Sequence, residues 1–339
     1  MPRRLLLVAL GAAVIAGFAV ERSTGGPVDR STVGAASTLE RVPRRGATPS
    51  REEATAAAPG VAVAPASPPS GEPAPAKPAP AVDVSARPVA AGDPAGLAEQ
   101  IVTAERAIRS PAATPEQLAY FGHLQQVAYR TLAVHPEWDE AVAAALPDDL
   151  RPVMAANVFA GRELRRPHRT PQDKLPAWRI VEPPPAAELR AYYEEGEATF
   201  GVPWEYLAAV NLTETRMGRI RGLSSAGARG PMQFIPSTWA AYGQGDIDDP
   251  HDAILSAARY LAANGGGSGN LPNALFRYNP AQWYVDAVTA YAEQMVADER
   301  AYLGYYAWQV YYTTSLGDVL LPVGYESTER RPVTPADLG

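Results

Sequence analysis

The sequence predicts a mainly α-helical protein. Apolar residues recur at three- and four-residue spacing, for example at Leu97, Ile101, Ala104 and Ile108, and this period places them on one face of a helix. Helix-start signals accompany such segments: Thr114 precedes a Pro-Glu pair, which is typical of an N-cap followed by a first turn. Because 46% of the residues are hydrophobic, the chain has enough apolar side chains to build a core of packed helices.

Composition excludes several classes of function. The chain has 339 residues, a formal net charge of −7 and no cysteine. Nucleic-acid-binding proteins usually carry a basic face, and none is evident here, so we expect no nucleic-acid partner. The absence of cysteine excludes disulfides, thiolate metal sites and a cysteine nucleophile. The four histidines lack metal-ligand spacing, so we expect no metal site and no cofactor; they are His123, His135, His168 and His251.

The first 20 residues predict an export segment. Arg3 and Arg4 form a basic start, and an unbroken run of apolar residues and glycine follows from Leu5 to Val20. The run is long for a signal-peptide core and slightly short for a membrane-spanning helix. Residues 1–20 are therefore either a signal peptide or an N-terminal membrane anchor, and we favour the anchor. In both cases the rest of the chain lies outside the cytoplasmic membrane, secreted or membrane-anchored and facing the cell wall.

Residues 21–91 predict a disordered linker. The chain contains 34 prolines, roughly twice the usual share, and they are concentrated in this segment together with alanine, glycine, serine and threonine. Such a sequence has too few bulky apolar groups to offset the entropy lost on ordering. We interpret it as a Pro/Ala-rich tether between the export segment and the folded part.

Helical periodicity resumes at residue 93 and predicts a small accessory subdomain over residues 93–165. Four helices with short turns between them fit this segment. We expect it to pack beside a second domain, over residues 186–325, which opens with a helix from Ala186 to Phe200 after a second Pro-rich crossing.

A single carboxylate stands out in the second domain. Leu207, Val210, Glu214 and Met217 follow helical spacing, so the pattern places Glu214 on an apolar helix face. Burial raises the pKa of a carboxyl group, as a general acid near neutral pH requires. Gly218 and the glycine at position 222 then turn the chain out of the helix. The alternative is a solvated glutamate at a helix end, paired with one of the nearby arginines.

The residues that follow carry a resemblance to a known family. The segment from Ser224 to Pro236, SSAGARGPMQFIP, resembles the signature of the soluble lytic transglycosylases, which are related in fold to goose-type lysozyme. The resemblance covers roughly Ala187–Met295 and implies a lysozyme-like catalytic domain with Glu214 as the catalytic residue. Ser224 matches the serine of the signature, although the spacing from Glu214 is one residue longer than the commonest one, so Ser225 remains a rival.

The resemblance also implies substrate-binding residues. Gln233 belongs to the Met-Gln pair of the signature, and its amide suits sugar hydroxyl or acetamido groups. Tyr278 and Asn279 match a Tyr-Asn element that lies close to the catalytic carboxyl group, although Pro280 departs from the residue usual after it. Tyr284 matches a further aromatic that lines the cleft, with core packing as the alternative.

The implied activity is that of a peptidoglycan lytic transglycosylase. In this family one glutamate first protonates the glycosidic oxygen of the MurNAc–GlcNAc β-1,4 bond. It then accepts the proton of the C6 hydroxyl, which attacks C1 and leaves a 1,6-anhydroMurNAc end. Two alternatives stay open: a lysozyme-type hydrolase, in which the aspartates near Asp246 activate water, and a non-enzymatic wall-binding scaffold. All three take peptidoglycan glycan strands as the partner.

Two further segments need an interpretation. The acidic run from Asp246 to Asp252 suits a hard cation such as calcium, but its Asp249-Pro250 pair is more typical of a helix start, with Asp249 as cap. The aromatic rings of the Tyr-rich tail from Tyr302 to Tyr325 suit sugar faces, but they are also large hydrophobic groups. The spacings Tyr302/Tyr305/Tyr306 and Trp308/Tyr312 fit helix packing, and we favour docking of the tail against the domain.

Overall fold

The structure, a computed structural model, describes residues 83–167 and 170–338. The predicted export segment (1–20) and most of the predicted linker (21–82) lie outside the described residues, and both stay predictions. Residues 83–91, assigned above to the linker, contact the first helix: the Gln100 side chain bonds the carbonyl of Val89 at 2.9 Å and the amide of Ala91 at 2.8 Å. The packed chain therefore begins earlier than Asp93. None of the described helices combines the length and apolarity needed to cross a bilayer.

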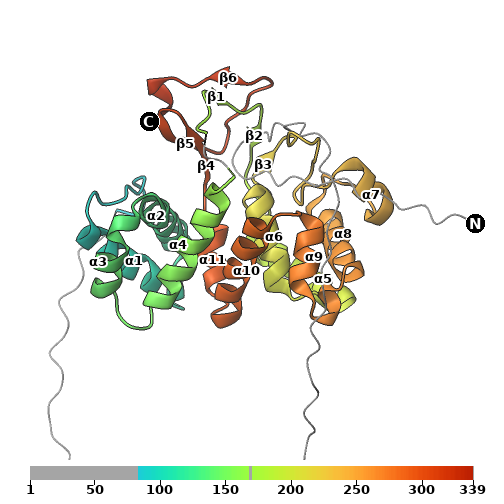
Figure 1. Cartoon of the computed structure of the whole chain (residues 1–339), viewed down its shortest axis with the longest axis horizontal. Helices are drawn as coiled ribbons and strands as arrows, with labels where there is room; N and C mark the ends of the chain where they lie inside the picture. Colours follow the sequence, from blue (N-terminus) through green and yellow to red (C-terminus); the bar gives the residue numbers. More distant parts are fainter. Residues whose placement is uncertain (1–82, 168–169, 339) are drawn as a thin grey trace, which may run out of the picture. The chain divides into compact units, whose positions relative to one another are not determined.

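The described chain is mainly α-helical, as predicted (Figure 1). The α-helices are α1 (Pro94–Arg109), α2 (Pro115–Val134), α3 (Asp139–Ala145), α4 (Arg151–Arg165), α5 (Ala186–Phe200), α6 (Trp204–Thr215), α7 (Pro236–Tyr242), α8 (Pro250–Ala263), α9 (Leu271–Tyr278), α10 (Gln282–Ala297) and α11 (Ala301–Tyr306). Short 3-10 turns lie at η1 (Pro136–Trp138), η2 (Gly266–Ser268) and η3 (Pro335–Leu338).

Side-chain caps begin two of these helices where the sequence predicted starts. The Thr114 side chain accepts from the Gln117 amide, and the Gln117 side chain accepts from the Thr114 amide in return. Asp249 accepts from the amide of Asp252 at 3.0 Å and caps α8. These contacts satisfy amides that a helix leaves unpaired at its start. The helix-start interpretation of Asp249 is confirmed.

Three small antiparallel strand pairs join the helices. They are β1 (Lys174–Leu175) with β6 (Arg331–Pro332), β2 (Arg179–Ile180) with β3 (Ile220–Arg221), and β4 (Val310–Thr314) with β5 (Gly317–Leu321). The helical spacing expected of Trp308 and Tyr312 is wrong, because the chain leaves α11 and forms the β4–β5 hairpin. The expected docking of the tail is confirmed, since Tyr302, Tyr305 and Trp308 are buried in the main core. β-branched and aromatic residues favour strands, and Gly317 supplies the positive φ of the turn.

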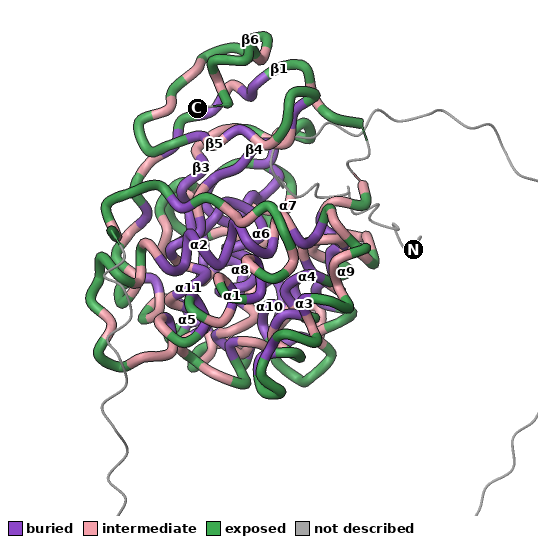
Figure 2. Tube along the Cα trace, turned by 90° about the vertical axis from the view of Figure 1, so that its left-hand side faces the viewer, coloured by how far each residue is buried: buried purple, intermediate pink, exposed green. Residues whose placement is uncertain are grey.

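One apolar core runs through the accessory helices and the second domain. Buried side chains of α1, α2 and α4 belong to the same cluster as those of α5, α6, α8 and α10, with α4 packed on α10 and α2 packed on α11. Figure 2 shows the buried residues gathered in the interior of the helical part, with exposed residues around them. A second, smaller cluster lies between the strand pairs and includes Leu175, Trp178, Ile220 and Tyr312. The accessory helices therefore share their core with the helix that carries Glu214.

Candidate active site

Glu214 lies in the last turn of α6, a helix that is enclosed on all sides. Every residue from Leu207 to Thr215 is buried, and Glu214 itself is only 2% exposed. The predicted single buried face is therefore wrong in detail: α6 is a central helix, packed against α5, α8, α10 and α11. Helices that are apolar nearly all round are those buried inside a larger core.

The helix also ends earlier than predicted. Arg216 takes the left-handed conformation with φ 54°, and Met217 follows with φ 60°. Met217 is therefore not on the helix, and the chain turns before it reaches Gly218. The amide of Met217 donates to the carbonyl of Asn211 at 3.2 Å, and this hydrogen bond closes the tight turn at the end of α6.

Tyr284 donates a hydrogen bond to Glu214. Its hydroxyl, carried by α10, donates to Glu214 Oε1 at 2.7 Å. Burial, together with the negative charge of Glu214, raises the pKa of Tyr284 well above its ordinary value, so the phenol stays protonated and remains a donor. The resemblance assigned Tyr284 only to the lining of the cleft; the structure gives it direct contact with the carboxylate.

Tyr278 lies beside Tyr284 with its ring parallel. The ring centroids are 6.5 Å apart and the planes differ by 2°. Burial, and then the charge of Glu214, raise the pKa of Tyr278 well above its ordinary value, as expected for a residue close to that carboxylate. Its hydroxyl donates to the backbone carbonyl of Met232 at 2.5 Å, and this bond ties α9 to the loop that contains Gln233.

Gln233 and Asn279 each bury one polar atom that has no hydrogen-bond partner within residues 83–167 and 170–338. These atoms are Gln233 Oε1, an acceptor, and Asn279 Nδ2, a donor. The other end of the Gln233 amide donates to the Gly230 carbonyl at 3.0 Å. Buried polar atoms are nearly always paired, so a free acceptor and a free donor are suited to a ligand with hydroxyl and amide groups.

The Ser224 side chain stabilises its own loop. Its Oγ accepts from the amides of Ala226 at 3.1 Å and Ala228 at 3.0 Å, the pattern of a serine turn. Ser225 is exposed. The substrate role that the resemblance implies for Ser224 stays a prediction, and its hydroxyl hydrogen is still available to donate.

Two polar residues beside Glu214 hold the loop in place, and the sequence analysis missed both. Asn211 Nδ2 and Thr215 Oγ1 donate to the Pro231 carbonyl at 2.9 and 2.6 Å. The signal was available, since a polar pair four residues apart on a buried helix must find partners.

Gly230, next in the loop, has φ 76°, and a side chain there would collide with the Ile247 carbonyl. Only glycine fits this position.

A pocket opens beside these residues. Its lining consists of Gln233, Phe234, Ile235, Thr238, Tyr260, Arg277 and Tyr278. It thus brings together Gln233 and Tyr278, two residues predicted to bind substrate, with further aromatic rings. Aromatic faces combined with a few polar groups are the usual lining of a ligand site.

The acidic segment from Asp246 to Asp252 is engaged in local contacts. Asp249, His251 and Asp252 have ligand atoms within 4.8 Å of one another. However, Asp249 caps α8, Asp252 accepts from the Asp246 amide at 2.8 Å, and His251 bonds Glu195 at 3.0 Å. These hydrogen bonds account for the clustering without a cation, since the same atoms organise the start of the helix.

Comparisons with known proteins agree with this site. Residues 191–296 match the family model of the transglycosylase SLT domain, a range that contains Glu214 and the other predicted site residues. A curated protein, membrane-bound lytic murein transglycosylase F of Thiobacillus denitrificans, is 33% identical over 75 residues. That alignment covers 22% of this chain and 16% of the relative, so the chain spans only a small part of the relative's length. No solved structure gave a significant match.

The predicted family resemblance is confirmed by these matches. The helices α5 to α10, which surround the candidate site, fall largely within the matched segment. The accessory helices and the β4–β5 hairpin lie outside it. Residues 191–296 of this chain therefore form a transglycosylase SLT domain of the lytic transglycosylase family.

Proposed function

We propose that the chain is a peptidoglycan lytic transglycosylase with Glu214 as its single general acid and base. One observation carries the proposal: a nearly covered carboxyl group, at the end of a buried helix, receives a 2.7 Å hydrogen bond from Tyr284. A carboxyl group in such surroundings exchanges its proton with a bound substrate rather than with bulk water.

The reaction needs two proton transfers through the same group. Glu214 first donates its proton to the glycosidic oxygen as the bond from that oxygen to C1 of MurNAc breaks. The resulting carboxylate then accepts the proton of the C6 hydroxyl as O6 bonds to C1. The products are a shortened strand, a 1,6-anhydroMurNAc end and a regenerated Glu214, and no water is consumed. The Tyr284 hydroxyl stabilises the carboxylate between the two transfers, because a hydrogen bond to the charged form favours that form.

The distribution of carboxylates supports a single acid. A hydrolase of the usual kind needs a second carboxylate at the bond to be cleaved. Among the described residues, the buried carboxylates are Glu105, Glu163 and Glu214, and only Glu214 belongs to the SLT segment. Asp246, the centre of the hydrolase alternative, is exposed and its side chain accepts from the Asp248 amide within its own loop.

The surroundings of Glu214 suit a glycan substrate. The free acceptor of Gln233 and the free donor of Asn279 complement hydroxyl and acetamido groups. The ring of Tyr278 and its neighbours in the pocket complement the apolar face of a sugar. The name of the curated relative, a membrane-bound lytic murein transglycosylase, supports murein as the substrate and an extracytoplasmic location, with residues 1–20 as signal peptide or anchor.

Mass spectrometry of digested peptidoglycan tests this proposal. Purified sacculi are incubated with the full-length wild-type chain, with Glu214→Gln, and with Glu205→Gln as a matched control on the same helix. We expect anhydro-ended muropeptides from the wild type and the control, and none from Glu214→Gln. Products with reducing ends, formed by the wild type and absent from Glu214→Gln, would contradict the proposal and indicate a lysozyme-type hydrolase. A folded wild-type chain that binds glycan but does not cleave it would also contradict the proposal and indicate a non-enzymatic wall-binding scaffold.

A further inference from the structure

The turn directly after Glu214 is conformationally strained. Arg216 and Met217 are consecutive non-glycine residues with φ values of 54° and 60°. L-residues avoid this left-handed region because the Cβ atom crowds the backbone. Two such residues in a row persist only where the surrounding structure holds them. What holds this turn also fixes the position of Glu214, which lies two residues before it.

Arg216 is held in a buried environment that contains no counter-ion. The residue is 9% exposed, and among the described residues the groups that act on its charge are Tyr291 and Arg130 rather than a carboxylate. Its Nη1 donates to the carbonyl of Leu212 in α6 at 2.8 Å, and its guanidinium carbon lies 5.8 Å from the ring centroid of Trp308. Burial lowers the pKa of Arg216 to about 10, so the group is still a cation at neutral pH. The indole ring supplies the cation–π contact that partly replaces lost hydration.

Trp308 connects the turn to the accessory helices. Its backbone carbonyl accepts from Arg219 Nε at 3.1 Å, and its ring lies against Arg216. On the other side, its indole Nε1 donates to Gln125 Oε1 of α2 at 2.9 Å. One residue thus contacts both arginines of the turn and a helix of the accessory subdomain.

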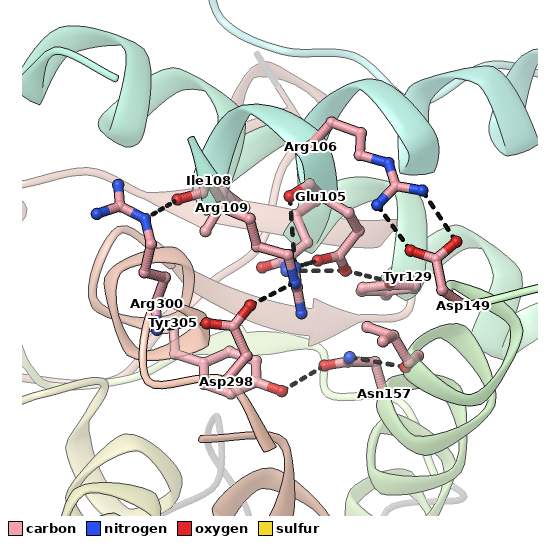
Figure 3. A network of polar contacts seen from close by, with 12 residues as sticks. Glu105, Arg106, Ile108, Arg109, Tyr129, Asp149, Asn157, Asp298, Arg300 and Tyr305 are labelled. Carbon is pink, nitrogen blue, oxygen red and sulfur yellow. Dashed lines mark hydrogen bonds and ion pairs between the residues drawn. The ribbon is translucent and has the colours of Figure 1, made fainter. Parts of the chain in front are cut away.

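The orientation of Gln125 is fixed by its two partners. An indole N–H can only donate, so the amide oxygen must face Trp308. The amide nitrogen then donates to Glu105 Oε1 of α1 at 3.0 Å. Glu105 is fully buried and is held by Tyr129 and Arg109 as well. Figure 3 shows the part of this network around Glu105, in which Arg109 also reaches Asp298 beyond the end of α10 at 2.9 Å.

The geometry points to a positioning function for the accessory helices: through Gln125 and Trp308 they hold the strained Arg216 turn, and thereby hold Glu214 against Tyr284. This inference rests on the proposed function. It makes Trp308 and Gln125 positioning residues for the reaction, because neither touches Glu214. Both lie outside residues 191–296, so the SLT segment needs parts of the chain that the family model does not cover.

Two conservative variants of the full-length chain test this. Trp308→Phe keeps an aromatic ring on the side of Arg216 and removes the indole N–H together with part of the fused ring. Gln125→Met keeps the length of the side chain and removes its polar atoms. A shift of a catalytic group by about 1 Å can cost about 100-fold in rate, so we expect kcat for anhydro-muropeptide release to fall between about 10- and 100-fold, with KM unchanged. We also expect the double variant to lose no more than the worse single variant, because both remove the same hydrogen bond.

The readouts separate positioning from simple loss of stability. Arg162→Met is the control, because Arg162 anchors α4 to the Ala133 carbonyl at 3.2 Å and to Asp139 at 2.6 Å within the accessory helices. We expect it to lower Tm without changing kcat of the folded protein. We further expect Trp308→Phe to move the high-pH limb of the kcat profile upwards, since a loosened Tyr284 contact stabilises the carboxylate less.

Three outcomes overturn the inference: an unchanged kcat and pH profile in folded Trp308→Phe, losses in the two single variants that multiply in the double variant, or an equal kcat loss in Arg162→Met. If Gln125→Met does not fold, Trp308→Phe and its pH profile decide alone. A folded wild type that releases no muropeptides would instead contradict the proposed function, so the two failures are distinguishable.

Discussion

Tyr284→Phe removes a single hydroxyl group and with it the 2.7 Å hydrogen bond to Glu214 Oε1. The ring stays, and it fills the same buried space beside Tyr278. A hydrogen bond to a charged group contributes about 1.5–3 kcal/mol. Since one pKa unit corresponds to about 1.4 kcal/mol, losing this bond makes Glu214 easier to protonate by about one to two pH units.

The consequence appears in the pH dependence of cleavage. The first step needs protonated Glu214, so the rate falls as pH rises and the proton is lost. In Tyr284→Phe we expect this fall to move upwards by about one to two pH units, together with a lower maximal rate, because the carboxylate formed between the two proton transfers is less stable. The assay is the initial rate of anhydro-muropeptide release, measured from acidic to weakly basic pH.

The matched control is Tyr302→Phe. It also removes the hydroxyl of a buried tyrosine, but that hydroxyl donates to the Ala186 carbonyl at 2.8 Å. We expect it to lower stability slightly and leave the pH profile of the wild type unchanged. An unshifted profile in Tyr284→Phe, or equal shifts in both variants, would refute the reasoning, because the bond to Glu214 would then not govern the titration that limits cleavage.

Three further predictions concern the loop and the pH dependence of stability. Gly230→Ala should abolish most cleavage, because the new methyl group meets the Ile247 carbonyl and displaces the loop of Gln233; an active, normally folded variant in the muropeptide assay would contradict this. Burial lowers the pKa of His123 from 6.5 to about 4, so the unfolded state binds the proton first and stability falls as pH drops from 6.5 towards 4, by at most about 3 kcal/mol. Urea unfolding of His123→Phe should lose this pH dependence, and a slope equal to that of the wild type would be inconsistent with it. Burial opposes ionisation of Asp318, but the positive charges of Arg130 and Arg165 outweigh it and hold the pKa of that carboxyl well below its usual range. The ionised Asp318 therefore stabilises the fold above the unfolded pKa of 3.8, and this stabilisation disappears as pH falls below that value. Thermal unfolding of Asp318→Asn should show a lower Tm than the wild type at neutral pH, and the difference should shrink in acid.

Features encoded by neighbouring residues could be predicted from the sequence. The caps at Thr114 and Asp249 act on amides three residues away, so residue type and order suffice to find them. The extent of α5, Ala186–Phe200, was also predicted correctly, since Pro185 precedes it and Gly201, with φ 71°, ends it. The family resemblance likewise rests on short stretches of consecutive residues, above all the segment from Ser224 to Pro236 and the Tyr278-Asn279 element.

Features that depend on distant residues could not be predicted in the same way. The contact between Tyr284 and Glu214 spans 70 residues, and no local pattern distinguishes it from core packing. The end of α6 at Thr215 was missed because the left-handed turn falls on Arg216 rather than on the next glycine, and its support comes from Trp308, far along the chain. Long-range packing overrides the local preference at such places.

Long-range packing also explains the β4–β5 hairpin, as it explains the turn at the end of α6. The spacing between Trp308 and Tyr312 fits a helix, but a few aromatic residues fit the period of a helix and that of a strand equally well. The segment forms a strand because Tyr312 pairs with Val319 across the β4–β5 hairpin. The spacing of residues along one segment contains no information on such a partner strand. The linker boundary was misplaced for a similar reason, since the Gln100 side chain binds Val89 and Ala91 through two hydrogen bonds.

The central claim is that one carboxyl group, Glu214, cleaves the glycan without water. The most direct measurement is digestion of peptidoglycan by the wild-type chain in water labelled with heavy oxygen, followed by mass spectrometry of the new chain ends. We predict anhydro ends that carry no label and that vanish in Glu214→Gln. New reducing ends that carry one heavy oxygen would contradict the claim, because water rather than the C6 hydroxyl would then have attacked C1.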